Sequence, residues 1–283
     1  MSRTAALRAP LVLIGGSLLV TLIVAAAFAP LLAPYDPRAP AADPLDVLLG
    51  PSGRHLLGTN SIGQDIFSQI VWGARTSLLV AAGSAVLSIT VGLIVGAIAG
   101  LVGGWPEVAL MRLIDVLLAV PRLPLLVLVA ALAGASLIGV ILLVGLLTWP
   151  VIARQVRAQS RSLRERGYLT AARGFGGGIG YLLRRHLVPA LGPILVSGFV
   201  AVAGNAVMLQ AALAFLGLGD PTAVSWGSIL NDALAEPGLY YTSLWVWWLL
   251  PAGFAITLAV LGFAFLGVGL EPLLNPRWQR AMT

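Results

Sequence analysis

The sequence predicts an all-α, polytopic membrane protein with six transmembrane helices. Of its 283 residues, 59% are hydrophobic and only 10% are charged, whereas soluble domains carry about a quarter charged residues. Five uncharged runs each exceed the roughly 20 residues that cross a bilayer core; they are 9–35, 76–106, 123–153, 187–219 and 237–270. All 17 positive side chains are arginines, and 13 of them fall in segments that this division places on one side of the membrane, which sets the predicted orientation.

The amino-terminal run is the first predicted span. Residues 1–10 hold Arg3 and Arg8 and are expected to form a short cytoplasmic N-terminus, followed by a helix over 11–33. The run is too long for the apolar core of a signal peptide, and prolines stand where a cleavage site would lie. We therefore expect this helix to be retained.

Residues 34–76 are predicted to form an external loop with two parts. Its first part is punctuated by five prolines and should be irregular. In its second part Ile66, Phe67, Ile70 and Val71 share one helical face. This pattern is typical of a short amphipathic helix at the membrane surface or on a partner's flank.

Residues 77–270 are predicted to form a core of five spans, at about 77–102, 108–132, 136–157, 190–217 and 244–270. In the first of them Gly92, Gly96 and Gly100 recur every fourth residue, which permits close helix packing. The second is extended back to residue 108 so that the arginine-rich segment falls inside. Arg112 and Asp115 then lie three residues apart near its cytoplasmic end, where they can pair.

The segment from Arg154 to Pro193 carries eight of the arginines and is expected to contain a cytoplasmic loop over 158–189. Its first part has no proline and a single glycine, which favours a helix, and a cluster of five glycines over 174–180 should end that helix. The loop over 219–243 is acidic and expected outside, whereas 271–283 should be a cytoplasmic C-terminus.

A motif within the arginine-rich segment resembles a known family. Thr170-Ala171-Ala172 and Gly176, followed after nine residues by His186-Leu187-Val188-Pro189, resemble the cytoplasmic "EAA" loop of bacterial ABC-importer permeases, most closely the dipeptide/oligopeptide/nickel group. Further similar stretches cover most of the chain after the first span; they lie within 57–78, 103–121, 212–227 and 262–277.

The resemblance implies a type I ABC importer permease fold in the bacterial plasma (inner) membrane. It implies a non-catalytic subunit that pairs with a homologous permease, two cytoplasmic ATPase subunits holding ATP and magnesium, and an extracytoplasmic substrate-binding protein. It does not imply nucleic-acid binding, and this chain would bind no cofactor or metal itself. Di- or oligopeptides are the expected substrates, with nickel chelates, glutathione or haem as alternatives.

The loop around Ala171 and Ala172 would be the coupling helix that an ATPase groove receives. The two alanines allow a close approach to the backbone, aromatic residues flank them as anchors, and arginines supply a polar rim. The expected coupling residues are Arg164, Tyr168, Thr170, Ala171, Ala172, Arg173, Phe175 and Gly176. Thr170 stands where the motif usually has glutamate. The alternative interpretation is an arginine-rich loop that only obeys membrane topology.

Three polar residues within the predicted spans are candidates for the pathway or for contacts between subunits. Arg122 would attract a peptide carboxylate or pair with a partner subunit. Asn205 and Gln210 would line the pathway or form hydrogen bonds between helices. A self-contained secondary transporter or channel is the alternative from another class, whereas an ATPase site is excluded because the chain has no lysine.

Overall fold

The computed structural model describes residues 10–40, 43–134, 136–164, 167, 174, 176 and 178–274, and within these residues its regular elements are helices. Five of the helices are long and apolar enough to cross a membrane, and a bent pair supplies a sixth span when it is counted as one. The long helices are α2 (Pro10–Ala27), α4 (Ile66–Val102), α7 (Leu137–Arg164), α10 (Val188–Phe215) and α13 (Leu249–Leu274). The predicted all-α polytopic membrane fold is confirmed.

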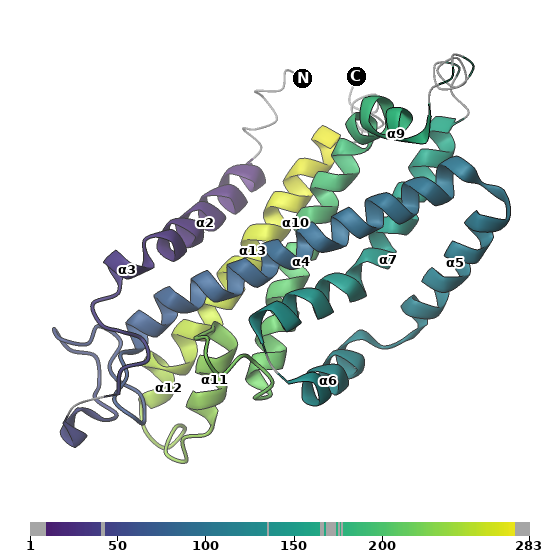
Figure 1. Cartoon of the computed structure of the whole chain (residues 1–283). Helices are drawn as coiled ribbons and strands as arrows, with labels where there is room; N and C mark the ends of the chain where they lie inside the picture. The colour runs from purple at the N-terminus through teal and green to yellow at the C-terminus, as the bar shows by residue number, and fades with distance from the viewer. Residues whose placement is uncertain are drawn as a thin grey trace.

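The long helices lie side by side in an elongated bundle (Figure 1). At one end, here called the arginine end, α4, α7 and α13 finish and α10 begins, next to the short α9 (Ile179–Leu182) and the π-helical turn η2 (Leu183–Leu187). The opposite end, here called the cap, consists of residues 28–40, 43–65 and 216–248. It contains α3 (Ala29–Leu32), the 3-10 turn η1 (Pro44–Asp46), α11 (Trp226–Leu234) and α12 (Leu244–Trp247).

Helix α4 differs from the sequence expectation because the amphipathic helix of the first loop and the following span form one element. It runs without a break for 37 residues, and the Asp65 side chain accepts a hydrogen bond from Ser68 N at its start. Its length of about 55 Å exceeds the roughly 30 Å bilayer core. The expected boundary at residue 76 is therefore not a boundary between elements.

The third expected span, 108–132, is broken into α5 (Gly104–Ala119) and α6 (Arg122–Ala133), which meet at 83°. Pro121 explains the break, since proline lacks an N–H donor and favours extended backbone at the preceding residue. Val120 is extended accordingly. Arg122 is thus the first residue of α6 at the bend, not a residue in the middle of a straight span.

Helices α4 and α7 pack closely along the glycine series of α4. A Cβ atom on Gly92 would lie 2.7 Å from Ile152 Cβ, and one on Gly100 would lie 2.6 Å from Ser160 Cβ. One on Gly96 would overlap the carbonyl oxygen of Ala153. The packing role predicted for these glycines is confirmed, and α4 and α7 form the most extensive contact between two helices among the described residues.

Candidate functional site

A polar cleft of about 290 Å³ lies between α6, α7 and α10. Five of its lining residues carry polar side chains, and they are Arg122, Thr148, Gln155, Ser197 and Asn205. The α7 and α10 members lie near the middle of their 28-residue helices. A helix of this length spans the bilayer, and polar side chains within spanning helices are rare and often mark a substrate path.

The sequence of α10 explains why these groups face the cleft. Ser197, Ala201 and Asn205 recur every fourth residue and therefore share one face of the helix. The neighbouring positions Val202, Ala203 and Ala206 are buried in the core. The small residues of the cleft face leave room beside the two polar side chains.

A second cleft lies on the other side of the same α10 face. It has a volume of about 650 Å³ between α10 and α13, and Ser197, Asn205, Phe263 and Glu271 are among its lining residues. Ser197 and Asn205 belong to both clefts and so form the ridge between them. Together the two clefts make one indented, partly polar flank of the bundle.

Gln210 does not join this flank. Its side chain is buried, and its Oε1 accepts a hydrogen bond of 3.1 Å from the Ser77 hydroxyl of α4. This bond links α4 to α10 within the core. Of the three candidate pathway residues, the fold brings Arg122 and Asn205 to one cleft and gives Gln210 a role between helices.

Ion pairs join α5 to the last turns of α7 at the arginine end. Glu107 accepts a 2.7 Å hydrogen bond from Arg157 Nε and has Arg161 at 3.9 Å. Asp115 pairs with Arg154, so the expected partner Arg112 is not the one that the fold selects. Glu107 and Asp115 are the only acids between residues 66 and 164. The isolation of these two acids in a long stretch could have marked them in the sequence. Nothing in the sequence indicated which arginines they would pair with.

The predicted coupling residues Tyr168, Thr170, Ala171, Ala172, Arg173 and Phe175 lie outside the described residues, whereas Arg164 and Gly176 lie within them. The Arg164 guanidinium lies against Gly103, the residue between α4 and α5. Gly176 has a φ of 81°, in the left-handed region that favours glycine. This conformation agrees with the expectation that the glycine cluster over 174–180 interrupts the helical backbone.

The cap is held by polar contacts across distant parts of the chain. His55 Nδ1 lies 2.9 Å from Asp65 Oδ1, and the His55 ring stacks on Tyr35 with centroids 4.7 Å apart. The buried Trp226 of α11 donates from Nε1 to the carbonyl of Ile70 at 3.0 Å. These contacts fix residues 34–40 and 43–65 and α11 on the first turns of α4, and the sequence carried no signal for them.

Asp220 of the cap holds the start of α7. Its Oδ2 accepts a 2.8 Å hydrogen bond from Leu137 N, and its Oδ1 accepts from Thr222 N and Oγ1 at 2.8 and 2.6 Å. Burial raises the pKa of Asp220, but the hydrogen bonds from Thr222 and Leu137, together with the positive charge of Arg38, outweigh it and leave the pKa below its ordinary value. The carboxylate form therefore stabilises this junction.

Comparisons with known proteins give a consistent result. Residues 92–280 match the family model described as "Binding-protein-dependent transport system inner membrane component", and residues 6–51 match the "N-terminal TM domain of oligopeptide transport permease C". A Brucella suis protein provisionally named a peptide permease is 40% identical, over 92% of this chain and 85% of its own length. A dipeptide transport system permease protein of Alkalihalophilus pseudofirmus is 35% identical, over 95% and 86%. A glutathione transport system permease protein of Pectobacterium atrosepticum is also 35% identical, over 94% and 87%.

Proposed function

The chain belongs to the family of binding-protein-dependent transport system inner membrane components, and on that premise we propose that it forms half of the translocation pathway of an ABC importer for di- or oligopeptides. The other half would come from a homologous permease. Two cytoplasmic ATPase subunits would supply the energy, with ATP and magnesium bound there, and an external binding protein would deliver the substrate.

The observation that carries the proposal is the polar cleft at mid-length of α7 and α10. Its amide, hydroxyl and guanidinium groups match the groups that a short peptide presents, namely backbone amides and a terminal carboxylate. The cleft lies on the indented flank of the bundle, which fits a path shared between two permeases. Names of relatives as peptide and dipeptide permeases support this substrate class.

Coupling to the ATPases is proposed to run through the loop at 158–189. The small side chains of Ala171 and Ala172 would let an ATPase groove approach the backbone. Helix α7 leads into this loop and is paired with α5 through Arg154 and Arg157. A displacement of the loop by the ATPase would therefore move α5 as well. Helix α5 ends at the bend that bears Arg122, so the displacement would reach the cleft.

The proposed orientation places the arginine end in the cytoplasm and the cap outside. In the sequence, 13 of the 17 arginines fall in the segments assigned to the cytoplasmic side, as the positive-inside bias requires. Under this orientation the N- and C-termini are cytoplasmic, and the cap faces the binding protein.

The test is uptake by proteoliposomes that contain this chain, its partner permease, the ATPase subunits and the binding protein. We expect labelled dipeptide to accumulate only with ATP on the ATPase side. Competition by unlabelled glutathione, rather than by dipeptides, would assign the substrate to the class named for the Pectobacterium relative. Uptake by this chain alone, without ATPase subunits, would contradict the proposal in favour of a secondary transporter or channel.

A further inference from the structure

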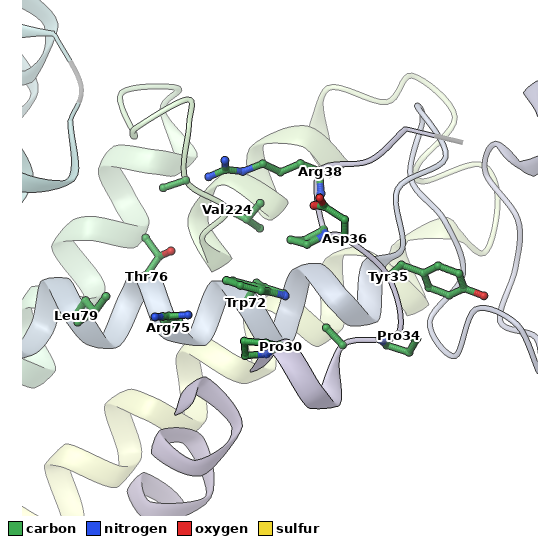
Figure 2. A pocket seen from close by; sticks show the side chains of 13 residues that line it. Pro30, Pro34, Tyr35, Asp36, Arg38, Trp72, Arg75, Thr76, Leu79 and Val224 are labelled. Atoms are coloured by element: carbon green, nitrogen blue, oxygen red, sulfur yellow. The ribbon is translucent and has the colours of Figure 1, made fainter. Parts of the chain in front are cut away.

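A cavity of about 600 Å³ opens on the flank of the bundle at the cap, away from the polar cleft. Its walls come from α3, the loop over residues 33–38, the α4 turns over 72–79, and residues 223–224 (Figure 2). The peptide pathway does not use it, and its lining combines positive charge, an indole ring and aliphatic side chains. We propose that this cavity binds the headgroup of an anionic phospholipid.

Two guanidinium groups define the polar part of the cavity. Arg38 reaches over it from the loop toward Val224, and Arg75 lies along α4 beside Trp72 (Figure 2). The Arg75 Cζ atom lies 5.6 Å from the Trp72 ring centroid, a cation–π contact that orients the guanidinium. Neither arginine belongs to an ion pair within 4.0 Å among the described residues. The Arg38 guanidinium acts at longer range on the Asp220 carboxylate, which accepts its hydrogen bonds from Thr222 and Leu137. Both guanidiniums therefore keep N–H donors for an external anion.

The cavity also contains one carboxylate, that of Asp36. Its Oδ1 accepts a 2.9 Å hydrogen bond from the backbone N–H of Arg38, so it is engaged in shaping the loop. With two guanidiniums and one carboxylate the lining stays net positive. A headgroup with one phosphate and free hydroxyls, such as that of phosphatidylglycerol, matches the two arginines and the carboxylate. Its phosphate accepts hydrogen bonds from the arginines, and a hydroxyl donates to Asp36.

The loop that bears Arg38 is held in place independently of its side chain. Tyr35 N donates to Ser68 Oγ at 3.2 Å, Gln69 Nε2 to the Pro37 carbonyl at 3.2 Å, and Gln64 Nε2 to the Arg38 carbonyl at 2.8 Å. All three bonds join loop backbone to the α4 side or to the turn before it. The cavity wall is therefore preformed, and the loop keeps its shape when the Arg38 side chain is changed.

Exposed aliphatic side chains continue from the cavity along α4 and show why a lipid is the occupant. Leu79 is 51% exposed and lies one turn beyond Arg75, and Ala82 and Val86 continue the same exposed face toward the middle of the bundle. Leu31 of α3, at the cap side, is 81% exposed. An acidic segment of a partner protein needs only the charges, whereas a phospholipid uses the charges and the aliphatic track together. Trp72 lies between them, as tryptophans do at membrane interfaces.

The experiment is native mass spectrometry of the purified transporter complex after extraction from vesicles of equal parts phosphatidylglycerol, phosphatidylethanolamine and phosphatidylcholine. We expect retention of phosphatidylglycerol on the wild-type complex and about fivefold lower occupancy for Arg38→Gln, the ratio expected when one arginine near the surface is lost. Arg54→Gln is the matched control because Arg54 is an exposed arginine of the cap that does not line the cavity. That variant should retain the lipid.

A second measurement distinguishes binding of a whole phospholipid from binding of a free phosphate or headgroup. The thermal midpoint of the detergent-solubilised complex should rise with dioctanoyl-phosphatidylglycerol and should not rise with glycerol phosphate or inorganic phosphate. Arg38→Gln should remove that rise, and Leu79→Asn should reduce it. Equal occupancy in wild type and Arg38→Gln would overturn the proposal. A rise with inorganic phosphate alone would overturn the lipid assignment, as would loss of binding-protein affinity in Arg38→Gln with lipid occupancy unchanged.

Discussion

Glu107 of α5 accepts a 2.7 Å hydrogen bond from the Arg157 guanidinium of α7, two turns before the described part of α7 ends. The Glu107 side chain is only 14% exposed, and Arg161 adds a second positive charge at 3.9 Å. Charge-assisted bonds of this kind are among the stronger polar contacts in proteins. The pair joins α5 to the turns of α7 that lead into the proposed coupling loop.

Reversing the charge at this pair should uncouple transport from ATP hydrolysis. Glu107→Arg places a guanidinium beside Arg157 and Arg161. The contact between α5 and α7 should lose about 1 kcal/mol of ion-pair stabilisation, which should loosen α5 from α7. We expect peptide uptake per ATP hydrolysed to fall severalfold in proteoliposomes. The double variant Glu107→Arg/Arg157→Glu restores opposite charges and should recover most of the uptake. If the double variant transports no better than Glu107→Arg, the pair does not carry coupling.

A bulky side chain in the proposed coupling helix should block ATPase docking. Ala172→Arg should abolish substrate-stimulated ATP hydrolysis while membrane insertion stays normal, because the ATPase groove can no longer approach the backbone. Gly53→Arg is the matched control, since that exposed glycine of the cap has no heavy atom within 4 Å of an added Cβ. Stimulated hydrolysis that is unchanged in Ala172→Arg would refute the coupling role.

Arg122 should act on the substrate carboxylate, because it lines the same cleft as Asn205. Arg122→Gln should lower uptake of a dipeptide about tenfold, which corresponds to about 1.4 kcal/mol. Uptake of the same dipeptide with an amidated C-terminus should change much less. Arg112→Gln removes an exposed α5 charge away from the cleft and should have little effect. Failure of Arg122→Gln to assemble with the partner permease would instead support the role of an inter-subunit contact.

The α4–α7 contact should tolerate no added methyl group at Gly96. Gly96→Ala drives a Cβ into the Ala153 carbonyl and Val156, and we expect destabilisation of about 1–3 kcal/mol from overpacking. Gly16→Ala in α2 meets no heavy atom within 4 Å. It should be neutral or stabilising by up to about 1 kcal/mol, since alanine favours helix more than glycine does. Thermal midpoints of the purified complexes would compare the two, and equal midpoints would contradict the close contact.

Acid should weaken the junction between Asp220 and α7. A carboxyl group whose folded-state pKa lies below its ordinary value of 3.8 stabilises the fold fully above that pH, and this contribution is lost as pH falls through the lowered pKa. The stability difference between wild type and Asp220→Asn should therefore be constant near neutral pH and shrink below about pH 4. Thermal midpoints at pH 7, 5, 4 and 3.5 would measure it. A difference that stays the same at every pH would exclude the carboxylate as the source.

Sequence analysis predicted the class of fold and most helix positions because the bilayer imposes a simple rule. An uncharged run of sufficient length has few alternatives to a spanning helix, so α2, α7, α10 and α13 lie close to their expected ranges. The glycine series of α4 was also readable, since a repeat every fourth residue leaves one bare helix face.

The candidate site was readable only in part. The sequence marked Arg122, Asn205 and Gln210 as polar residues in apolar surroundings. It held no signal that Arg122 and Asn205 would line a cleft while Gln210 would be buried between helices. Chain spacing cannot tell which helix faces which, and only packing placed Gln210 against Ser77 and turned Asn205 to the cleft. The bend at Pro121 had a proline as its signal, yet its 83° angle depends on how α6 packs on α7 and α10.

What the sequence by itself predicted correctly is the position of most spanning helices, and it also shows an arginine-rich segment with two adjacent alanines. These are properties of single segments, decided by the transfer of side chains between water and lipid. The tertiary structure alone decided the partners: Glu107 with Arg157, Asp220 with the start of α7, and Arg38 with Arg75 around one cavity. Such pairs join segments far apart in the chain, so they exist only once the helices have packed.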